Sequence, residues 1–99
     1  MSEDSVAFIN VIDVEPERSE ELVALLKEGA EQAIIDRPGF MSLELLISKD
    51  RTRVVNIARW SSAQDAKAAQ QDPMAAAFAK KAAEIASPNP GIYNVVSRY

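Results

Sequence analysis

The chain of 99 residues contains no cysteine and no histidine. The lack of cysteine excludes disulfides, thiolate catalysis and metal sites built on thiolates. The lack of histidine removes the commonest general base, the commonest zinc ligand and the usual proximal ligand of haem. Any chemistry that the chain performs must therefore depend on other side chains, and we expect no metal site.

Long apolar runs and clusters of basic residues are missing as well. No segment approaches the roughly 20 apolar residues that a membrane-spanning helix needs. The formal net charge is −4, which argues against nucleic acid, whose phosphates attract clustered Lys and Arg. The acidic N-terminal segment Met1–Asp4 lacks the features of a signal peptide. We therefore expect a cytoplasmic protein that binds neither nucleic acid nor a membrane.

What the chain does contain is an ordinary supply of core-forming residues. Apolar residues make up 47% and charged residues 26% of the sequence, as in a typical globular protein. This length suits one domain spanning residues 1–99. A domain of this size buries only about two-thirds of the surface that its unfolded chain exposes, so alone it is marginally stable.

The first part of the chain predicts a strand, a helix and a second strand. Residues 5–14 are rich in Val, Ile and Phe, which is typical of a strand. Pro16 suits the first turn of a helix whose buried stripe runs from Leu22 to Ala33. Pro38-Gly39 then ends the helix and opens a strand over residues 40–48.

The second part predicts a strand, two helical segments and a last strand. A short turn around Lys49-Asp50 indicates that residues 52–60 pair with the preceding strand as an antiparallel hairpin. Ser61 and Gln64 form a capping-box pattern for a helix over residues 63–70. Asp72-Pro73 begins another helix, residues 87–91 form a rigid loop, and residues 92–98 form the last strand.

The resulting order, βαββαβ, predicts a ferredoxin-like α+β fold with a four-stranded antiparallel sheet. Side chains alternate across a sheet, which groups Phe40 with Ser42 and Leu46 on one face of the second strand. Large apolar residues occur in both alternating sets of the first three strands, but helices cover only one face. Exposing the other face would cost about 25 cal/mol per Å² of apolar area. We therefore expect a homodimer that buries it.

Asn56 and Trp60 form the most suggestive polar pair, because their spacing of four places both on one side of a strand. Ala58 lies between them and leaves a gap. Asn10 reaches the same side if the first strand neighbours the third, as the fold requires. Buried donors without partners cost about 1–3 kcal/mol each. These residues therefore predict contact with a substrate oxygen, a backbone carbonyl or an ordered water.

Along nearly its whole length the sequence resembles the antibiotic biosynthesis monooxygenase family. The most specific part of the likeness is the Asn-x-x-x-Trp element, Asn56 to Trp60, which is followed by Ser61 and an Ala-rich helix. The other matching features mark the fold: Asn10 ahead of a Glu-rich helix, Pro38-Gly39-Phe40, Asp72-Pro73 and Pro90-Gly91-Ile92-Tyr93.

This resemblance implies a dimeric α/β barrel with one cavity per subunit between sheet and helices. It implies an oxygenase that uses O₂, without metal or flavin, to oxidise an activated phenol, an anthrone-like compound or a quinol. By that likeness Asn56 and Trp60 would donate hydrogen bonds to the substrate oxygen or a peroxide, and Asn10 would be a third donor or would orient them. The expected walls are Phe8, Ala58, Met74 and Phe78, of which Met74 and Phe78 also fit an ordinary core stripe.

Departures from the family pattern keep other hypotheses open. Some polyketide-oxidising members place a tyrosine and an arginine on the later helices, where this chain is rich in alanine. Haem-degrading relatives hold iron with a histidine, which this chain lacks. The second hypothesis is a non-catalytic ligand-binding or stress-related barrel, because fold does not fix function. The third is a structural dimer in which the Asn and Trp side chains satisfy each other and a water.

Overall fold

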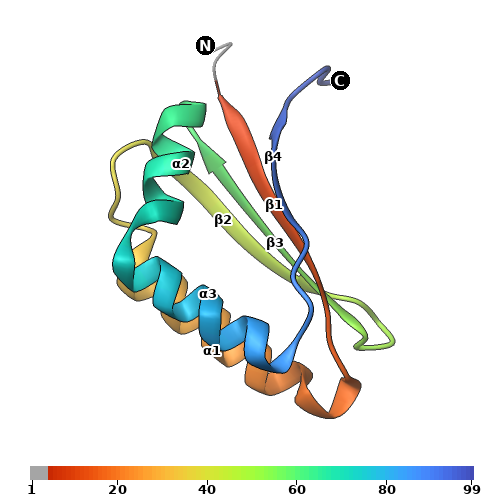
Figure 1. Cartoon of the computed structure of the whole chain (residues 1–99). Helices are drawn as coiled ribbons and strands as arrows, with labels where there is room; N and C mark the ends of the chain where they lie inside the picture. Colours follow the sequence, from red (N-terminus) through yellow and green to blue (C-terminus); the bar gives the residue numbers. More distant parts are fainter. Residues whose placement is uncertain (1–4) are drawn as a thin grey trace.

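The computed structural model describes residues 5–99. Residues 1–4, on which the prediction about a signal peptide rests, lie outside the described residues. Secondary structure follows the predicted βαββαβ order, with the second helical region divided in two (Figure 1). The elements are β1 (Val6–Asp13), the 3₁₀ helix η1 (Pro16–Arg18), α1 (Ser19–Ala33), β2 (Phe40–Ile47), β3 (Arg53–Trp60), α2 (Ala63–Gln71), α3 (Pro73–Ile85) and β4 (Pro90–Asn94).

The strands form one antiparallel sheet in the order β2-β3-β1-β4. Figure 1 shows the helices together on one face of this sheet, with α3 beside α1. The predicted ferredoxin-like α+β fold is therefore confirmed. No helix of residues 5–99 is long and apolar enough to cross a membrane.

A β-bulge near the start of β2 changes which of its side chains share a face. Phe40 is the partner of Trp60, and the register then shifts so that Leu43 is the partner of Ala58. The extra residue of a bulge reverses the alternation beyond it. Phe40 therefore shares the helix-covered face with Leu43, and the predicted grouping of Phe40 with Ser42 is wrong. The rings of Phe40 and Trp60 pack edge to face, with centroids 5.7 Å apart.

The core between sheet and helices consists of two apolar clusters. One surrounds Trp60 and includes Val6 and the alanines Ala66 and Ala69 of α2. The other includes Ile12 of β1 and Val54 of β3, together with residues of α1 and α3. Asn10 and Asn56 lie between the two clusters along β1 and β3. The fold thus places a polar pair in the middle of an otherwise apolar layer.

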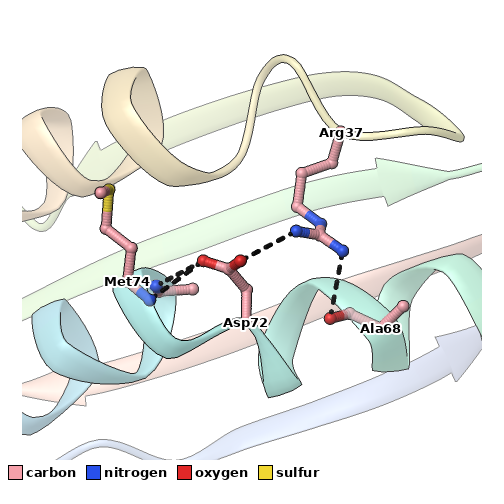
Figure 2. Close-up of polar contacts among 5 residues, drawn as sticks. Arg37, Ala68, Asp72 and Met74 are labelled. Atoms are coloured by element: carbon pink, nitrogen blue, oxygen red, sulfur yellow. Dashed lines mark hydrogen bonds and ion pairs between the residues drawn. The ribbon is translucent and has the colours of Figure 1, made fainter.

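Asp72 joins α2 to α3, as the Asp-Pro pattern predicted. Its carboxylate accepts hydrogen bonds from the backbone N–H groups of Met74 and Ala75, both at 3.1 Å, and so caps α3. Arg37, from the loop after α1, donates to the same carboxylate at 3.1 Å and to the carbonyl of Ala68 at 3.4 Å (Figure 2). These contacts fix the α2–α3 corner against that loop.

Two predicted boundaries differ from the structure. Ser62, not Ser61, caps α2, because its Oγ accepts the Asp65 N–H at 3.1 Å, while Ser61 Oγ donates to the Asp65 carboxylate. The predicted capping box of Ser61 with Gln64 is therefore wrong. β4 spans Pro90–Asn94 instead of residues 92–98, because its pairing with β1 ends where β1 begins, at Val6. Pro90 is tolerated there because β4 is an edge strand.

Candidate active site

A cavity of about 300 Å³ lies between the sheet and the helices. This volume is at the lower end of the range of about 300–1,000 Å³ that is typical of small-molecule sites. Its apolar walls come from every layer of the fold, with Leu25 and Leu26 from α1, Leu43 from β2 and alanines from α2 and α3. Its polar side chains lie mainly on the sheet.

Asn10, Asn56 and Trp60 all line this cavity. Asn10 of β1 and Asn56 of β3 are direct partners in the antiparallel register. Trp60 lies on the same face of β3 and is only 2% exposed. The three polar residues singled out in the sequence are therefore brought together on one side of the sheet.

Three of the four predicted wall residues also line the cavity. Phe8 and Ala58 are partners on β1 and β3, and Phe78 faces them from α3. Phe78 lies close to α1, where a Cβ on Gly29 would be only 3.0 Å from its ring. The glycine thus permits this close approach of α3 to α1.

Met74 does not line the cavity, so its predicted place in the wall is not found. Its side chain is 49% exposed near the start of α3. The residues of α3 that face the cavity are Ala75, Phe78, Ala79 and Ala82. Met74 precedes Ala75, which turns it away by about 100° around the helix axis. The spacing predicted that Met74 and Phe78 share one side of this helix, but only Phe78 faces the cavity.

The amide of Asn10 is held in one orientation by the loop before β4. Its Oδ1 accepts the backbone N–H of Asn89 at 2.8 Å. The carbonyl of Asn89 in turn accepts the Val11 N–H at 3.3 Å, which ties the loop to β1. The Asn10 carbonyl is therefore occupied, and its NH₂ group is what it offers to other partners. Sequence reasoning missed Asn89, because its partner is distant in the chain.

Asn56 differs from Asn10 in the atom that lacks a partner. Its Oδ1 is buried and has no hydrogen-bond partner among residues 5–99. An unsatisfied buried polar atom costs about 1–3 kcal/mol, so such atoms usually meet a water or a ligand. The sequence hypothesis treated Asn56 as a donor, whereas the atom left without a partner is an acceptor.

Gln70 is a further polar residue of the cavity that sequence reasoning missed. It follows Ala69 and lies four residues after Ala66, two buried alanines that also line the cavity. This position on the α2 stripe was the available signal. Gln70 itself is exposed, as are Pro88 and Pro90 in the lining. These residues mark where the cavity reaches solvent.

The lining side chains among residues 5–99 are all uncharged. The described residues also contain no group of three or more His, Cys, Asp or Glu side chains placed to hold a metal ion. The site therefore offers hydrogen bonds from amides and an indole, apolar contact surface, and no local charge.

The chain belongs to the antibiotic biosynthesis monooxygenase family, whose family model matches residues 5–81. This match confirms the resemblance seen in the sequence. The matched range includes the three polar residues of the cavity, Asn10, Asn56 and Trp60.

Tetracenomycin-F1 monooxygenase of Streptomyces glaucescens is 39% identical to this chain over 72 residues. The match covers 73% of this chain and 64% of that relative. The chain therefore spans less than two-thirds of the relative's length, and the relative's activity does not transfer by identity alone.

Solved structures share the fold. A variant of SnoaB, a cofactor-independent oxygenase from Streptomyces nogalater, superposes with a TM-score of 0.87 at 22% identity, covering 96% of both chains. A conserved protein from Methanosarcina mazei superposes with a TM-score of 0.83 at 13% identity, covering 93% of both chains. At these identities the likeness shows the fold alone.

Proposed function

We propose that this protein is a cofactor-independent monooxygenase that oxidises an activated phenolic, anthrone-like or quinol substrate with O₂. The observation that carries the proposal is the convergence of Asn10, Asn56 and Trp60 on one cavity with apolar walls. Family membership supports it, as does the activity named for the Streptomyces glaucescens relative.

In this reaction the substrate supplies its own electrons. An electron-rich anthrone or phenol loses a proton to give an enolate, and the enolate carbon reduces O₂ and forms a carbon–oxygen bond. The resulting peroxide then loses water. One oxygen atom of O₂ remains on the carbon as a carbonyl, and the other leaves as H₂O together with the two hydrogens lost by the substrate.

The protein's part in this scheme is electrostatic. Fixed donors aimed at an oxygen that gains negative charge stabilise the transition state most strongly where water is excluded. The NH₂ group of Asn10, oriented by Asn89, and the indole N–H of Trp60 are the proposed donors. Asn56 contacts the same oxygen-bearing edge of the substrate. Phe8, Ala58 and Phe78 would hold the rings and exclude water.

Oxygen uptake with a panel of anthrones and hydroquinones tests this proposal. We expect Trp60→Phe and Asn56→Ala each to lower kcat by about 10²-fold, the usual effect of losing one oxyanion donor or contact. The matched controls are Tyr99→Phe and Asn94→Ala, which remove polar groups at exposed positions outside the cavity. No uptake with any compound, or unchanged rates in both cavity variants, would contradict the proposal.

A second candidate function is ligand binding without turnover. It is favoured by the side chains that α2 and α3 turn toward the cavity, which are alanines, Gln70 and Phe78 and include neither tyrosine nor arginine. A pure binding protein would gain thermal stability with ligand, as binding to the native state requires, but would consume no O₂. Thermal melts and oxygen uptake on the same compounds separate the two functions.

We also propose a homodimer formed through the sheet face that carries no helix. Leu46 of β2 and Tyr93 of β4 are 47% and 51% exposed on this face. Ile57 of β3 lies on the same face of the sheet. Burial against a second sheet would remove this apolar area from water. The cytoplasmic location expected from the sequence stays a prediction.

A further inference from the structure

The two amides of the cavity are paired across β1 and β3 but are left with opposite needs. Asn10 has its carbonyl occupied by the Asn89 N–H at 2.8 Å. Asn56 has its carbonyl oxygen buried and without a partner among residues 5–99. Asn10 therefore offers a donor, and Asn56 requires one. A cavity occupant that only accepts hydrogen bonds would leave Asn56 Oδ1 unsatisfied.

We infer that a hydroxyl group of the substrate donates a hydrogen bond to Asn56 Oδ1. This inference rests on the proposed function and adds the polarity of the group that the substrate presents. A hydroxyl donates one hydrogen bond and still has lone pairs to accept from Asn10 or Trp60. One hydroxyl group can thus satisfy Asn56 Oδ1 and also accept from a neighbouring donor of the cavity. An ether, a ketone or a carboxylate does not donate.

The remaining surroundings select an uncharged form of this hydroxyl compound. The lining side chains carry no charge, and two nearby carboxylates bind protein groups: Asp72 binds Arg37 at 3.1 Å, and Asp65 accepts from the hydroxyls of two serines. Lys81 Nζ lies 5.7 Å from the ring centroid of Phe78, on a residue that does not line the cavity. An anion would lose its hydration without gaining a cation. The substrate therefore binds as the neutral phenol.

A matched pair of ligands isolates the hydroxyl donor. 1-Naphthol and 1-methoxynaphthalene have the same two rings and an oxygen attached at the same ring carbon, but only naphthol donates a hydrogen bond. Titrations without oxygen separate binding from turnover. Trp60 is the only tryptophan, so its single indole N–H signal in a ¹H–¹⁵N spectrum reports directly on the cavity. We expect naphthol to bind about tenfold more tightly than its methyl ether.

The charge requirement is tested in the same titration. 1-Naphthoate has the same rings but carries a carboxylate. We expect it to bind at least about tenfold more weakly than naphthol, because its charge would be desolvated without a partner. Affinity of naphthoate equal to or above that of naphthol would overturn the assignment of an uncharged ligand.

Variants at Asn56 distinguish an acceptor from a donor. Asn56→Leu removes the whole amide, so the affinity ratio of naphthol to methoxynaphthalene should fall to about one. Asn56→Asp keeps acceptor oxygens and loses the N–H donors, so it should retain the preference for naphthol. Asn94→Leu makes the same change at an exposed residue outside the cavity and should leave the ratio at the wild-type value. If Asn56 acts only as a donor, naphthol and methoxynaphthalene can both accept from it, so the wild-type ratio is already near one and the inference fails.

A measurement on the wild-type protein avoids any folding defect of the variants. The sequence has four asparagines, at positions 10, 56, 89 and 94, so side-chain ¹³Cγ labelling gives few signals. The Asn56 signal should shift more with saturating naphthol than with saturating methoxynaphthalene, because only naphthol adds a hydrogen bond to its carbonyl oxygen. Equal affinities for the pair, no binding of either, or an unshifted Asn56 signal would overturn the inference.

These outcomes are distinct from failure of the oxygenase itself. A naphthol preference that depends on Asn56, in a protein that oxidises no compound, would support the ligand assignment and contradict the proposed function. Turnover that depends on Trp60 without any hydroxyl preference would support the function and contradict the assignment.

Discussion

At the scale of single residues, Gly39 is the position where the backbone most clearly requires glycine. Its φ is +83°, and a Cβ there would collide with the carboxylate of Asp65. That carboxylate accepts hydrogen bonds from the hydroxyls of Ser61 and Ser62 at the start of α2. Because the Gly39 carbonyl also accepts the Ser61 N–H at 2.8 Å, this glycine ties β2 to the end of β3.

We expect Gly39→Ala to lower the free energy of unfolding by about 1–3 kcal/mol, from strain at positive φ and from displacement of Asp65. Urea denaturation measures this change. Gly91→Ala is the matched control, because the nearest atoms there belong to the exposed ring of Tyr93. Equal stability of the two variants would contradict the account of Gly39.

The residues of the site were predictable to the extent that strand geometry determines them. Spacing in one strand placed Asn56 and Trp60 together, and antiparallel pairing added Asn10. The hydrogen bond from Asn89 was not predictable, because the two partners lie 79 residues apart. The unpaired state of Asn56 Oδ1 depends on all surrounding layers, so no local pattern encodes it. Met74 was misplaced because it lies at the solvent edge of the predicted α3 stripe, whereas Phe78 and Ala82 of the same stripe do face the cavity.

At the scale of elements, the β2–β3 turn is organised by Asp50. Its carboxylate accepts hydrogen bonds from the Thr52 hydroxyl and the Ser48 hydroxyl, both at 2.7 Å, and from the Thr52 N–H at 3.1 Å. These bonds, the Thr52 hydroxyl first, lower the pKa of Asp50 from 3.8 to about 2. The turn also places Arg51 at a φ of 64°, a conformation that an ordered turn must support.

A lowered pKa in the folded state links the turn to pH. The contribution of Asp50 to stability is fully present above pH 3.8, the ordinary pKa, and is lost as the pH falls through about 2. We expect Asp50→Asn to remove this part of the acid dependence, so that its unfolding free energy falls less steeply with pH over that window. Denaturation at a series of pH values tests this, with Asp36→Asn as an exposed control. Parallel curves for wild type and Asp50→Asn would count against it.

The α2–α3 corner depends on one carboxylate for two tasks. Asp72 caps α3 and binds Arg37 (Figure 2). We expect Asp72→Ala to cost about 1–2 kcal/mol, mostly from the lost cap. We expect Arg37→Ala to cost less, because a partly exposed ion pair contributes at most about 1 kcal/mol. Thermal and urea unfolding compare the two, and a larger loss in Arg37→Ala would show that the ion pair, not the cap, dominates.

Element types and order followed from periodicity and from Pro, Gly and Asp signals, while boundaries often did not. The bulge in β2 has no sequence signal that alternation reveals, so the face of Phe40 was misassigned. The cap of α2 moved by one residue because Ser61 and Ser62 are both competent caps. β4 moved toward the N-terminus because the extent of its pairing is set by β1, not by its own sequence.

At the scale of the whole molecule, the uncovered sheet face carries the expectation of a homodimer. A charge placed in the middle of that face would remain hydrated in a monomer and would be desolvated in a dimer. Ile57→Lys should therefore shift the protein toward monomer, by at least about tenfold in the dissociation constant. Light scattering after size-exclusion chromatography measures the mass. Ala24→Lys on exposed helix surface is the control, and a monomeric wild type would refute the dimer.

Asn10, Asn56 and Trp60 are the side chains proposed to promote the reaction of a bound aromatic compound with O₂. The most direct measurement is a single turnover of an anthrone under ¹⁸O₂, with the product analysed by mass spectrometry. We predict one ¹⁸O atom per quinone and a rate that falls about 10²-fold in Trp60→Phe. A quinone without label, or labelling by the wild-type protein no faster than by Trp60→Phe or in buffer alone, would contradict this claim.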